Sequence, residues 1–357
     1  MNSLALNFLV EEIMQEEEQC KNAQRVFRRK LRDITNPFEL PESLVNKSAF
    51  SYLLKVLTKY TPRRKKQFAV APIVKLSACL RFFAEGGYQT GVGKDHDVGL
   101  AQSSFSKVLT EVLDVFGTYL CPQWVQFPTT QEEKRKIAIS FYGKHKIPGV
   151  VGCVDGTHVR IIAPSENKHL YYNRKGYFSL NVMLACDHEL KIRCVDASHP
   201  GACHDSFIWN VSDLRKHCEE EFSGQTRNFW LLGDAGYPLE PWLLTPYRTP
   251  EDGSAELRFN EIHSKCRNII ERTNGVLKNR WRCILGAREL HYTPEKAAKI
   301  VNVCCCLHNI CIHFKVNTPV ADPDVSVDEI ESISIISQHN LEIARSIRCS
   351  IRDSIAN

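Results

Sequence analysis

The chain has no apolar run long enough to cross a membrane. A membrane-spanning helix needs about 18 to 20 consecutive apolar residues, whereas the best candidate, IVNVCCCLHNICIHF at 300–314, contains two asparagines and two histidines. The N-terminus also lacks the basic start of a signal peptide, and glutamates follow its short apolar stretch at positions 11, 12 and 16–18. We therefore expect a protein that neither spans a membrane nor enters the secretory pathway.

Cysteine pairs with the spacing of a zinc site are also missing, although cysteine is abundant. No Cys-x-x-Cys occurs among the 15 cysteines, which are most simply free thiols in a reducing compartment. The segment CCCLHNICIH at 304–313 combines four cysteines with two histidines, but these positions spread around the whole circumference of a helix. The segment therefore predicts a buried, cysteine-rich core helix rather than a zinc site.

Charge is unevenly distributed along a chain of ordinary globular composition. Charged residues make up 24% and hydrophobic residues 43%, which argues against wholesale disorder. Residues 19–66, including RRKK at 63–66, contain 13 Lys and Arg against three acids, whereas residues 150–357 contain 24 basic and 26 acidic residues. A basic front half indicates a polyanionic partner, although a solvated surface produces the same pattern.

The expected helices and strands divide the chain into four regions. Residues 1–130 are helical, 131–147 form a charged helical connector, 148–315 alternate strands with helices, and 316–357 form a polar tail with a short final helix. Strands interleaved with helices predict an α/β sheet domain. The N-terminal helical patterns cover 4–15, 20–32, 48–60, 72–84 and 102–116. The expected strands are GVVGCVD, HVRIIAP, YFSLNVMLACD, LKIRCVDA and NFWLLGD, with helices at 204–217, 260–283 and 294–314.

The segment 72–116 is typical of a helix-turn-helix. Its first helix ends at the glycine pair 86–87, and Gln102, Ser103 and Lys107 lie at the exposed start of the second, recognition-type helix. The positions expected to face inward are Phe105, Val108 and Leu109. Helix pairs of this kind also occur in proteins that do not bind DNA, so the spacing alone leaves DNA binding open.

Three acidic residues lie where a sheet domain can use them for chemistry. Asp155, in VVGCVDGTHVRI, and Asp234, in FWLLGDAGYP, each end an apolar run and precede a glycine, so we expect both at strand ends. Ligand sites of open α/β sheets lie outside the carboxyl ends of strands, so the two acids predict one site. Glu271, in NIIERTNGVLKNRW, lies in a helical pattern, with Lys278 and Arg282 on the same expected face.

These three acids supply the minimum set for a two-metal site. Two cations about 3.5–4 Å apart need one bridging carboxylate and one further carboxylate each to promote in-line phosphoryl displacement. Oxygen ligands suit Mg²⁺ or Mn²⁺ rather than zinc. For any one of these acids alone, capping or a surface position is the simpler explanation.

Six ordered motifs resemble the Harbinger superfamily of transposases and the nucleases derived from them. They are VVGCVDGTHVRI, YYNRKGYFSLNVMLACD, HPGACHDSFIW, LLGDAGYP, IIERTNGVLKNRW and CCCLHNIC, within residues 148–314. The resemblance implies a ribonuclease-H-like α/β fold, a mixed sheet flanked by helices, preceded by an all-α helix-turn-helix-like region. It also implies a catalytic triad of Asp155, Asp234 and Glu271, in which Asp155 bridges the metals from the end of the first sheet strand.

Two further segments match family motifs. Asp205, in HPGACHDS, is either a fourth metal ligand or a cap of the following helix; the family motif usually has serine where this chain has Ala202-Cys203. The segment HLYYNRKGYF at 169–178 places Arg174 and Lys175 among tyrosines. Such basic and aromatic side chains neutralise phosphates and stack on bases, although an ordinary polar loop has the same composition.

We therefore expect an endonuclease that hydrolyses DNA with Mg²⁺ or Mn²⁺, two ions being the expected number. The alternative is a catalytically silent DNA-binding or adaptor protein that keeps the fold. The resemblance further implies a Myb-like partner protein that supplies DNA specificity and nuclear import, and we expect a nuclear protein with a cytoplasmic pool. The sequence leaves open whether the chain forms a homo-oligomer.

Overall fold

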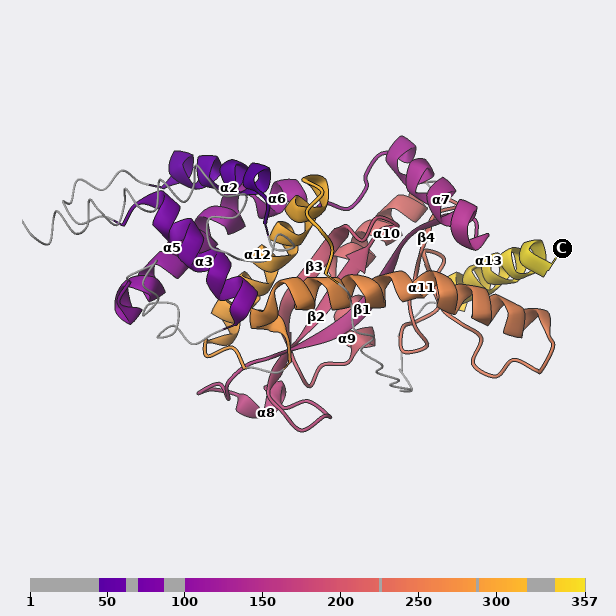
Figure 1. Cartoon of the computed structure of the whole chain (residues 1–357). Helices are drawn as coiled ribbons and strands as arrows, with labels where there is room; N and C mark the ends of the chain where they lie inside the picture. Colours follow the sequence, from indigo (N-terminus) through magenta and orange to yellow (C-terminus); the bar gives the residue numbers. More distant parts are fainter. Residues whose placement is uncertain are drawn as a thin grey trace, which may run out of the picture. The chain divides into compact units, whose positions relative to one another are not determined.

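The computed structural model describes residues 45–61, 70–86, 100–224, 227–286, 289–319 and 338–356 (Figure 1). These residues fall into two compact units, which are described separately. No helix among them combines the length and the apolar character that crossing a membrane requires. The helices expected at 4–15 and 20–32, the RRKK segment and most of the polar tail lie outside the described residues.

The first unit is helical and comprises described residues between 45 and 82, 100 and 112, and 313 and 317. Its helix α2 (Lys47–Tyr60) is capped by Asn46, whose side chain accepts a hydrogen bond from the Ala49 amide at 3.0 Å. Helix α3 (Pro72–Glu85) pairs with α5 (Gln102–Tyr119) through a 2.7 Å ion pair between Lys75 and Glu111. The three amphipathic patterns that fall here therefore form helices.

Helices α3 and α5 are the two helices expected for the helix-turn-helix. At the start of α5, Gln102, Ser103 and Lys107 are exposed. The inward-facing residues Phe105, Val108 and Leu109 are buried, as predicted. Residues 87–99, which would form the turn region, lie outside the described residues. The helix-turn-helix therefore stays a prediction.

The second unit contains a five-stranded mixed sheet of order β3-β2-β1-β4-β5. The pairs β1–β2 and β2–β3 are antiparallel, and β1–β4 and β4–β5 are parallel. The strands are β1 (Val150–Arg160), β2 (Ser179–Cys186), β3 (Ile192–Pro200), β4 (Trp230–Leu232) and β5 (Leu243–Leu244). The mixed α/β architecture agrees with the expectation, although the two-residue β5 was not anticipated.

Strand β1 is one continuous strand, which corrects the expected strand end at Asp155. The apolar runs on either side of Asp155-Gly156 belong to the same strand, since Gly156 pairs with Met183 of β2 and the ladder continues to Arg160. Gly156 does not mark a turn. A Cβ atom at this position would lie 2.2 Å from Oδ1 of Asp205, so glycine is required by the close approach of another side chain.

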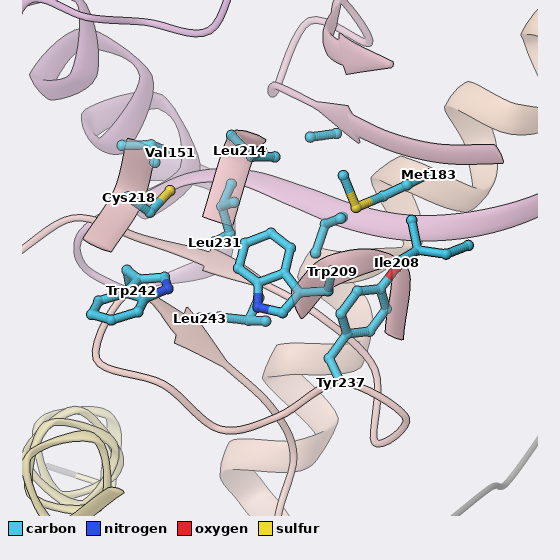
Figure 2. Close-up of a cluster of buried hydrophobic side chains, with 12 residues drawn as sticks. Val151, Met183, Ile208, Trp209, Leu214, Cys218, Leu231, Tyr237, Trp242 and Leu243 are labelled. Carbon is cyan, nitrogen blue, oxygen red and sulfur yellow. The ribbon is translucent and has the colours of Figure 1, made fainter. Parts of the chain in front are cut away.

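Helices cover both faces of the sheet, and the alternation of β1 side chains separates the two faces. Cys153 and Asp155 contact α11 (Ala255–Arg280), which Figure 1 shows running across the sheet. Val154 belongs instead to a buried cluster with α9 (Asp205–Val211) and α10 (Asp213–Ser223). Figure 2 shows the indole of Trp209 within this cluster, beside Leu231, Leu243 and Tyr237. The sheet is therefore the middle layer of this unit.

Two expected helices differ in detail. The pattern at 204–217 forms two helices, α9 and α10, because Ser212 ends the first and caps the second by accepting a hydrogen bond from the Arg215 amide at 3.1 Å. The connector segment 131–147 forms α7 (Gln131–His145), which packs on β1 and buries Lys134 in an ion pair with Glu221 of α10. Two short helices, α6 (Cys121–Trp124) and α8 (Lys168–Tyr171), lie in the connections.

The cysteine-rich segment forms a buried helix, as predicted. Helix α12 (Pro294–His313) buries all four of its cysteines. Its Asn309 is also buried and joins two other segments: Nδ2 donates to the Trp124 and Ile192 carbonyls, both at 2.7 Å, and Oδ1 accepts from the Ile192 amide at 2.8 Å. This one side chain therefore satisfies three backbone groups in the core.

The final helix α13 (Gln338–Ala356) packs against α11. Arg348 donates hydrogen bonds to the carbonyls of Thr245 and Pro246 at 3.0 and 3.1 Å, and its guanidinium lies 3.9 Å from the ring centre of Tyr247. Arg352 forms an ion pair with Glu256, in the first turn of α11, at 3.4 Å. The C-terminal helix thus fixes the start of α11 and the loop before it.

Replacing Asn309 with leucine should lower the free energy of unfolding by about 3 kcal/mol, because each buried backbone group left without a partner costs about 1–3 kcal/mol. Asn302→Leu on the same helix is the control, since the buried Oδ1 of Asn302 has no hydrogen-bond partner among the described residues; its effect should stay within about 1 kcal/mol. Urea unfolding measures both, and equal effects would contradict the bridging role of Asn309.

Candidate active site

The register of the parallel pair β1–β4 brings the two aspartates together. Cys153 of β1 lies beside Leu232, the last residue of β4. Two residues further along each of these segments comes an aspartate, Asp155 after Cys153 and Asp234 after Leu232. The Asp234 carboxylate is fixed by the Gly236 amide, which donates to its Oδ1 at 2.9 Å. The prediction that Asp234 follows a strand end is therefore confirmed, whereas Asp155 lies in the middle of its strand.

Helix α11 presents three polar side chains on one face: the cation Arg267, the acid Glu271 and the amide Asn274. The Arg267 guanidinium lies 3.3 Å from Oδ1 of Asp155 and donates to Oε1 of Glu271 at 2.7 Å. Asn274 Nδ2 lies 3.5 Å from the other Asp155 oxygen. Arg267 thus joins two of the predicted catalytic acids through its own charge.

Asp205 approaches the same region of β1 from the opposite face of the sheet. It is the first residue of α9, and the preceding His204 is the cap residue, so Asp205 does not itself cap the helix. Its Oδ1 accepts a 2.7 Å hydrogen bond from Asn181 of β2, and its carboxylate fills the space left by Gly156. Asp205 is therefore held beside the backbone of the residue that follows Asp155.

The neighbouring acids act on the protonation of Asp155. Burial raises the pKa of Asp155 to about 7, and the negative charges of Asp234, Asp205 and Glu271 contribute to the increase, while Arg267 opposes it. Burial works against the charge of Arg267, but Asp155, Asp234 and Glu271 outweigh it and raise the pKa of this arginine. The four carboxylates therefore form one electrostatic cluster, in which Arg267 is the counterion.

The basic loop between α8 and β2 extends to this cluster through His204. Asn173 shapes the loop, because its Oδ1 accepts from the Lys175 amide at 2.9 Å. Arg174 then lies 2.6 Å from Nε2 of His204, and burial together with the Arg174 charge lowers the pKa of this histidine. Arg174 is thus positioned next to Asp205, and Lys175 is exposed on the same loop.

The predicted cations beyond Glu271 do not both lie on its helix. Lys278 is two turns further along α11 and partly exposed. Helix α11 ends at Arg280, and Arg282 begins the 3-10 turn η1 (Arg282–Ile284), so its expected place on the Glu271 face is wrong. The backbone leaves the helix here and buries Trp281, Cys283 and Ile284, which leaves Arg282 exposed between them.

Comparisons with known proteins identify the family of this chain. Residues 154–309 match the DDE superfamily endonuclease family. The protein named "Putative nuclease HARBI1" from Rattus norvegicus is 33% identical over 316 residues, covering 86% of this chain and 88% of the relative. The Homo sapiens protein of the same name is 33% identical over 285 residues, covering 79% and 80%. This chain belongs to the Harbinger transposase-derived nuclease family.

More distant similarity extends to plants. "Protein ALP1-like" from Arabidopsis thaliana is 28% identical over 186 residues, covering 48% of this chain and 45% of the relative. No solved structure matches the chain. The Harbinger resemblance deduced from six motifs is thus confirmed at the level of the family.

The donor chemistry of the site fits a hard divalent cation. Carboxylate oxygens are the preferred protein ligands of Mg²⁺ and related ions, and the charges of Asp234, Asp205 and Glu271 all act on Asp155. Among the described residues, no three His, Cys, Asp or Glu side chains converge into a ready ligand group. Instead, Arg267 lies between Asp155 and Glu271. The Harbinger-derived site therefore has suitable ligands, two of which are neutralised by an arginine.

Sequence reasoning missed three residues of the site: Arg267, Asn181 and Asn274. Arg267 precedes Glu271 by four residues, the spacing of an ion pair on a helix, but the cations sought from sequence were those after Glu271. Asn181 had a visible signal, since it is the polar residue within the apolar run SLNVMLAC and a buried polar group needs a partner. Asn274 had no signal beyond its helical spacing from Glu271.

Asp155→Asn should stabilise the metal-free protein at pH 8 by about 2–4 kcal/mol, since each unit of pKa difference between the folded and unfolded states corresponds to about 1.4 kcal/mol. The folded protein binds the Asp155 proton more tightly than the unfolded chain, because the pKa is about 7 rather than 3.8. Wild-type stability should therefore fall as pH rises from about 4 to 7, while the variant lacks this loss.

Urea unfolding in EDTA between pH 4.5 and 8.5 measures this difference, which should be small at the acid end and complete above pH 7. The matched control is Asp252→Asn, which removes an acid exposed in the turn before α11 and should show no such pH-dependent gain. A constant difference between wild type and Asp155→Asn across this range would contradict the electrostatic cluster.

Proposed function

We propose that this protein is a metal-dependent endonuclease that hydrolyses DNA phosphodiester bonds with two divalent cations, Mg²⁺ or Mn²⁺. The observation that carries the proposal is geometric: the parallel register of β1 and β4 brings Asp234 next to Asp155, and Arg267 of α11 contacts both Asp155 and Glu271. Membership of the transposase-derived nuclease family supports the same reaction class. The strand order and directions of the sheet support a ribonuclease-H-like fold.

Each acid has a role in this proposal. Asp155 would bridge the cations, with Asp234 and Glu271 each holding one, and Asp205 would be a fourth ligand or neighbour. The bound cations would supply charge neutralisation at the phosphate and a water of lowered pKa. Arg267 balances Asp155 and Glu271 when no metal is bound, so metal binding would require its ion pairs to loosen.

The basic residues would hold the DNA. Phosphate contacts would come from Arg174 and Lys175 on the loop beside Asp205, from Lys278 near the end of α11, and from Arg282 in η1. Such contacts position a duplex without reading its sequence. Gln102, Ser103 and Lys107 would form the recognition surface of a helix-turn-helix, a role supported by their exposure at the start of α5. Nuclear location with a cytoplasmic pool, a Myb-like partner protein and self-association are further parts of the proposal, supported by the family and by the basic residues of 19–66.

A second candidate is a catalytically silent DNA-binding or adaptor protein. One observation favours it: Arg267 lies against both Asp155 and Glu271, where its charge competes with that of a bound cation. The two candidates differ in a cleavage assay on plasmid and terminal-repeat DNA with Mg²⁺, Mn²⁺ or EDTA, with and without a Myb-like partner. Cleavage that needs the metal and is lost in Asp155→Asn supports the nuclease, whereas DNA binding without cleavage in every condition supports the silent protein.

Glu271→Gln should lower the rate of single-turnover cleavage by more than about 100-fold, because it removes a charged metal ligand. DNA binding should be kept or tightened, because a negative charge beside the phosphates is gone. Glu271 is about half exposed, so folding should be unaffected. Gel-shift titration, cleavage and urea unfolding of the same variant test this. Wild-type cleavage by Glu271→Gln would remove Glu271 from the triad.

Lys278→Ala should do the reverse and weaken DNA binding equally on unrelated sequences. The slope of log affinity against log salt should become shallower by about 0.9 for the lost phosphate contact. Lys216→Ala is the control, because Lys216 is exposed on α10, which covers the other face of the sheet from α11. Identical salt slopes for wild type and Lys278→Ala would exclude a phosphate contact at Lys278.

A further inference from the structure

Tyr237 lies in the turn that follows Asp234 and belongs to the buried hydrophobic cluster that α9 and α10 form against the sheet. The Tyr237 amide donates to the Asp234 carbonyl at 3.3 Å, and the side chain is only 2% exposed. Its ring meets Trp209 edge-on, with ring centres 6.2 Å apart, and Figure 2 shows it beside Trp209 and Ile208. A Cβ at Gly233 would come within 3.1 Å of the tyrosine. The turn is thus shaped to admit this side chain.

The Tyr237 ring is well packed, but its hydroxyl group is buried without a hydrogen-bond partner among the described residues. A phenylalanine would fill the same space without the cost of desolvating an unpaired polar group. Packing therefore accounts for an aromatic ring at this position and leaves the hydroxyl unexplained.

The charges of three acids of the site act on the Tyr237 hydroxyl. Burial raises the pKa of Tyr237 well above its ordinary value, and the charges that add to this increase belong to Asp205, Asp155 and Asp234, in that order of size. The hydroxyl therefore keeps its proton and is a hydrogen-bond donor on the carboxylate side of the core. Asp205 has the largest of these influences.

A second buried polar atom without a partner belongs to a residue that contacts the same aspartate. Asn181 uses its Nδ2 atom to hold Oδ1 of Asp205 at 2.7 Å, while its own Oδ1 is buried without a hydrogen-bond partner among the described residues. Tyr237 packs against Trp209, one helical turn after Asp205 on α9, and Asn181 contacts Asp205 directly, so both side chains lie on the side of the core where α9 begins. Buried waters typically make about three hydrogen bonds to such otherwise unsatisfied groups.

We propose that Tyr237 is a positioning residue for Asp205, acting through one buried water. The water accepts the Tyr237 hydroxyl proton in a hydrogen bond and donates its own two protons to Asn181 Oδ1 and to the Asp205 carboxylate. This fixes the orientation of Asp205 beside Asp155 before a metal arrives. The inference rests on the proposed function, since it gives Asp205 a part in the metal site rather than in capping α9.

The test is Mn²⁺ binding to the full chain, measured by electron paramagnetic resonance without DNA. Tyr237→Phe should weaken Mn²⁺ binding about tenfold, the usual effect of losing a partner behind a metal ligand. The control is Tyr247→Phe, whose hydroxyl lies 3.7 Å from Cys349 Sγ under α13 and should leave Mn²⁺ affinity unchanged. In an Asp205→Asn background, the tenfold effect of Tyr237→Phe should disappear, because the carboxylate that it positions is gone.

Wild-type Mn²⁺ affinity in Tyr237→Phe, with or without a loss of stability in EDTA, would overturn the inference. An undiminished tenfold loss in the Asp205→Asn background would overturn it as well. If Tyr237→Phe does not fold, Asn181→Ser takes its place and must show a loss of Mn²⁺ affinity that depends on Asp205.

Asp155→Asn separates this inference from the proposed function. If Asp155→Asn binds Mn²⁺ like wild type, the metal site itself is wrong. If Asp155→Asn loses Mn²⁺ while Tyr237→Phe keeps it, the metal site stands and only the role of Tyr237 fails.

Discussion

Repulsion between carboxylates on a rigid support is the constraint on which the site depends. Asp155 lies in the middle of β1, with the β2 ladder running past it on one side, so it has no room to move away from Asp234, Asp205 and Glu271. The strain can be relieved only by a proton or a cation. Arg267 supplies a cation from the chain itself, and a metal would have to compete with it. In the proposed metal site, affinity for the cation and stability without it would therefore be coupled through this arginine.

The site is also shaped by what the fold omits. Strand β4 has three residues and pairs with β1 only as far as Cys153, so no neighbouring strand covers that edge of Asp155. The missing side chain of Gly156 lets Asp205 approach from the other face. A larger residue at 156 would collide with the Asp205 carboxylate. The short strand and the glycine are thus as much part of the site as the carboxylates.

Local patterns were sufficient to find the acids but not to place all of them. The apolar runs before Asp155 and Asp234 identified both strands because buried strands carry near-continuous apolar residues. The glycine after Asp155 suggested a turn, but the reason for this glycine is its contact with Asp205. Asp205 lies 49 residues away in sequence, so nothing beside Gly156 predicts the contact. Arg282 was misplaced because helical periodicity does not report where a helix ends, and here buried residues around Trp281 end it. Arg267 was overlooked although its spacing from Glu271 was readable.

The C-terminal helix has a consequence for how this nuclease can be divided. The region shared with DDE endonucleases, residues 154–309, begins inside β1 and excludes both α7 and α13. A fragment cut at those limits would lose residues 150–153 of the central strand β1 and the helix α7 that packs on it. It would also lose Arg348 and Arg352 of α13, which hold the loop before α11 and the first turn of α11. The limits of the region shared with the family therefore differ from the limits of the region that folds together. The smallest fragment that keeps these contacts extends from α7 through the C-terminal helix, so a loss of DNA binding or cleavage in a shorter truncation would report on folding rather than on chemistry.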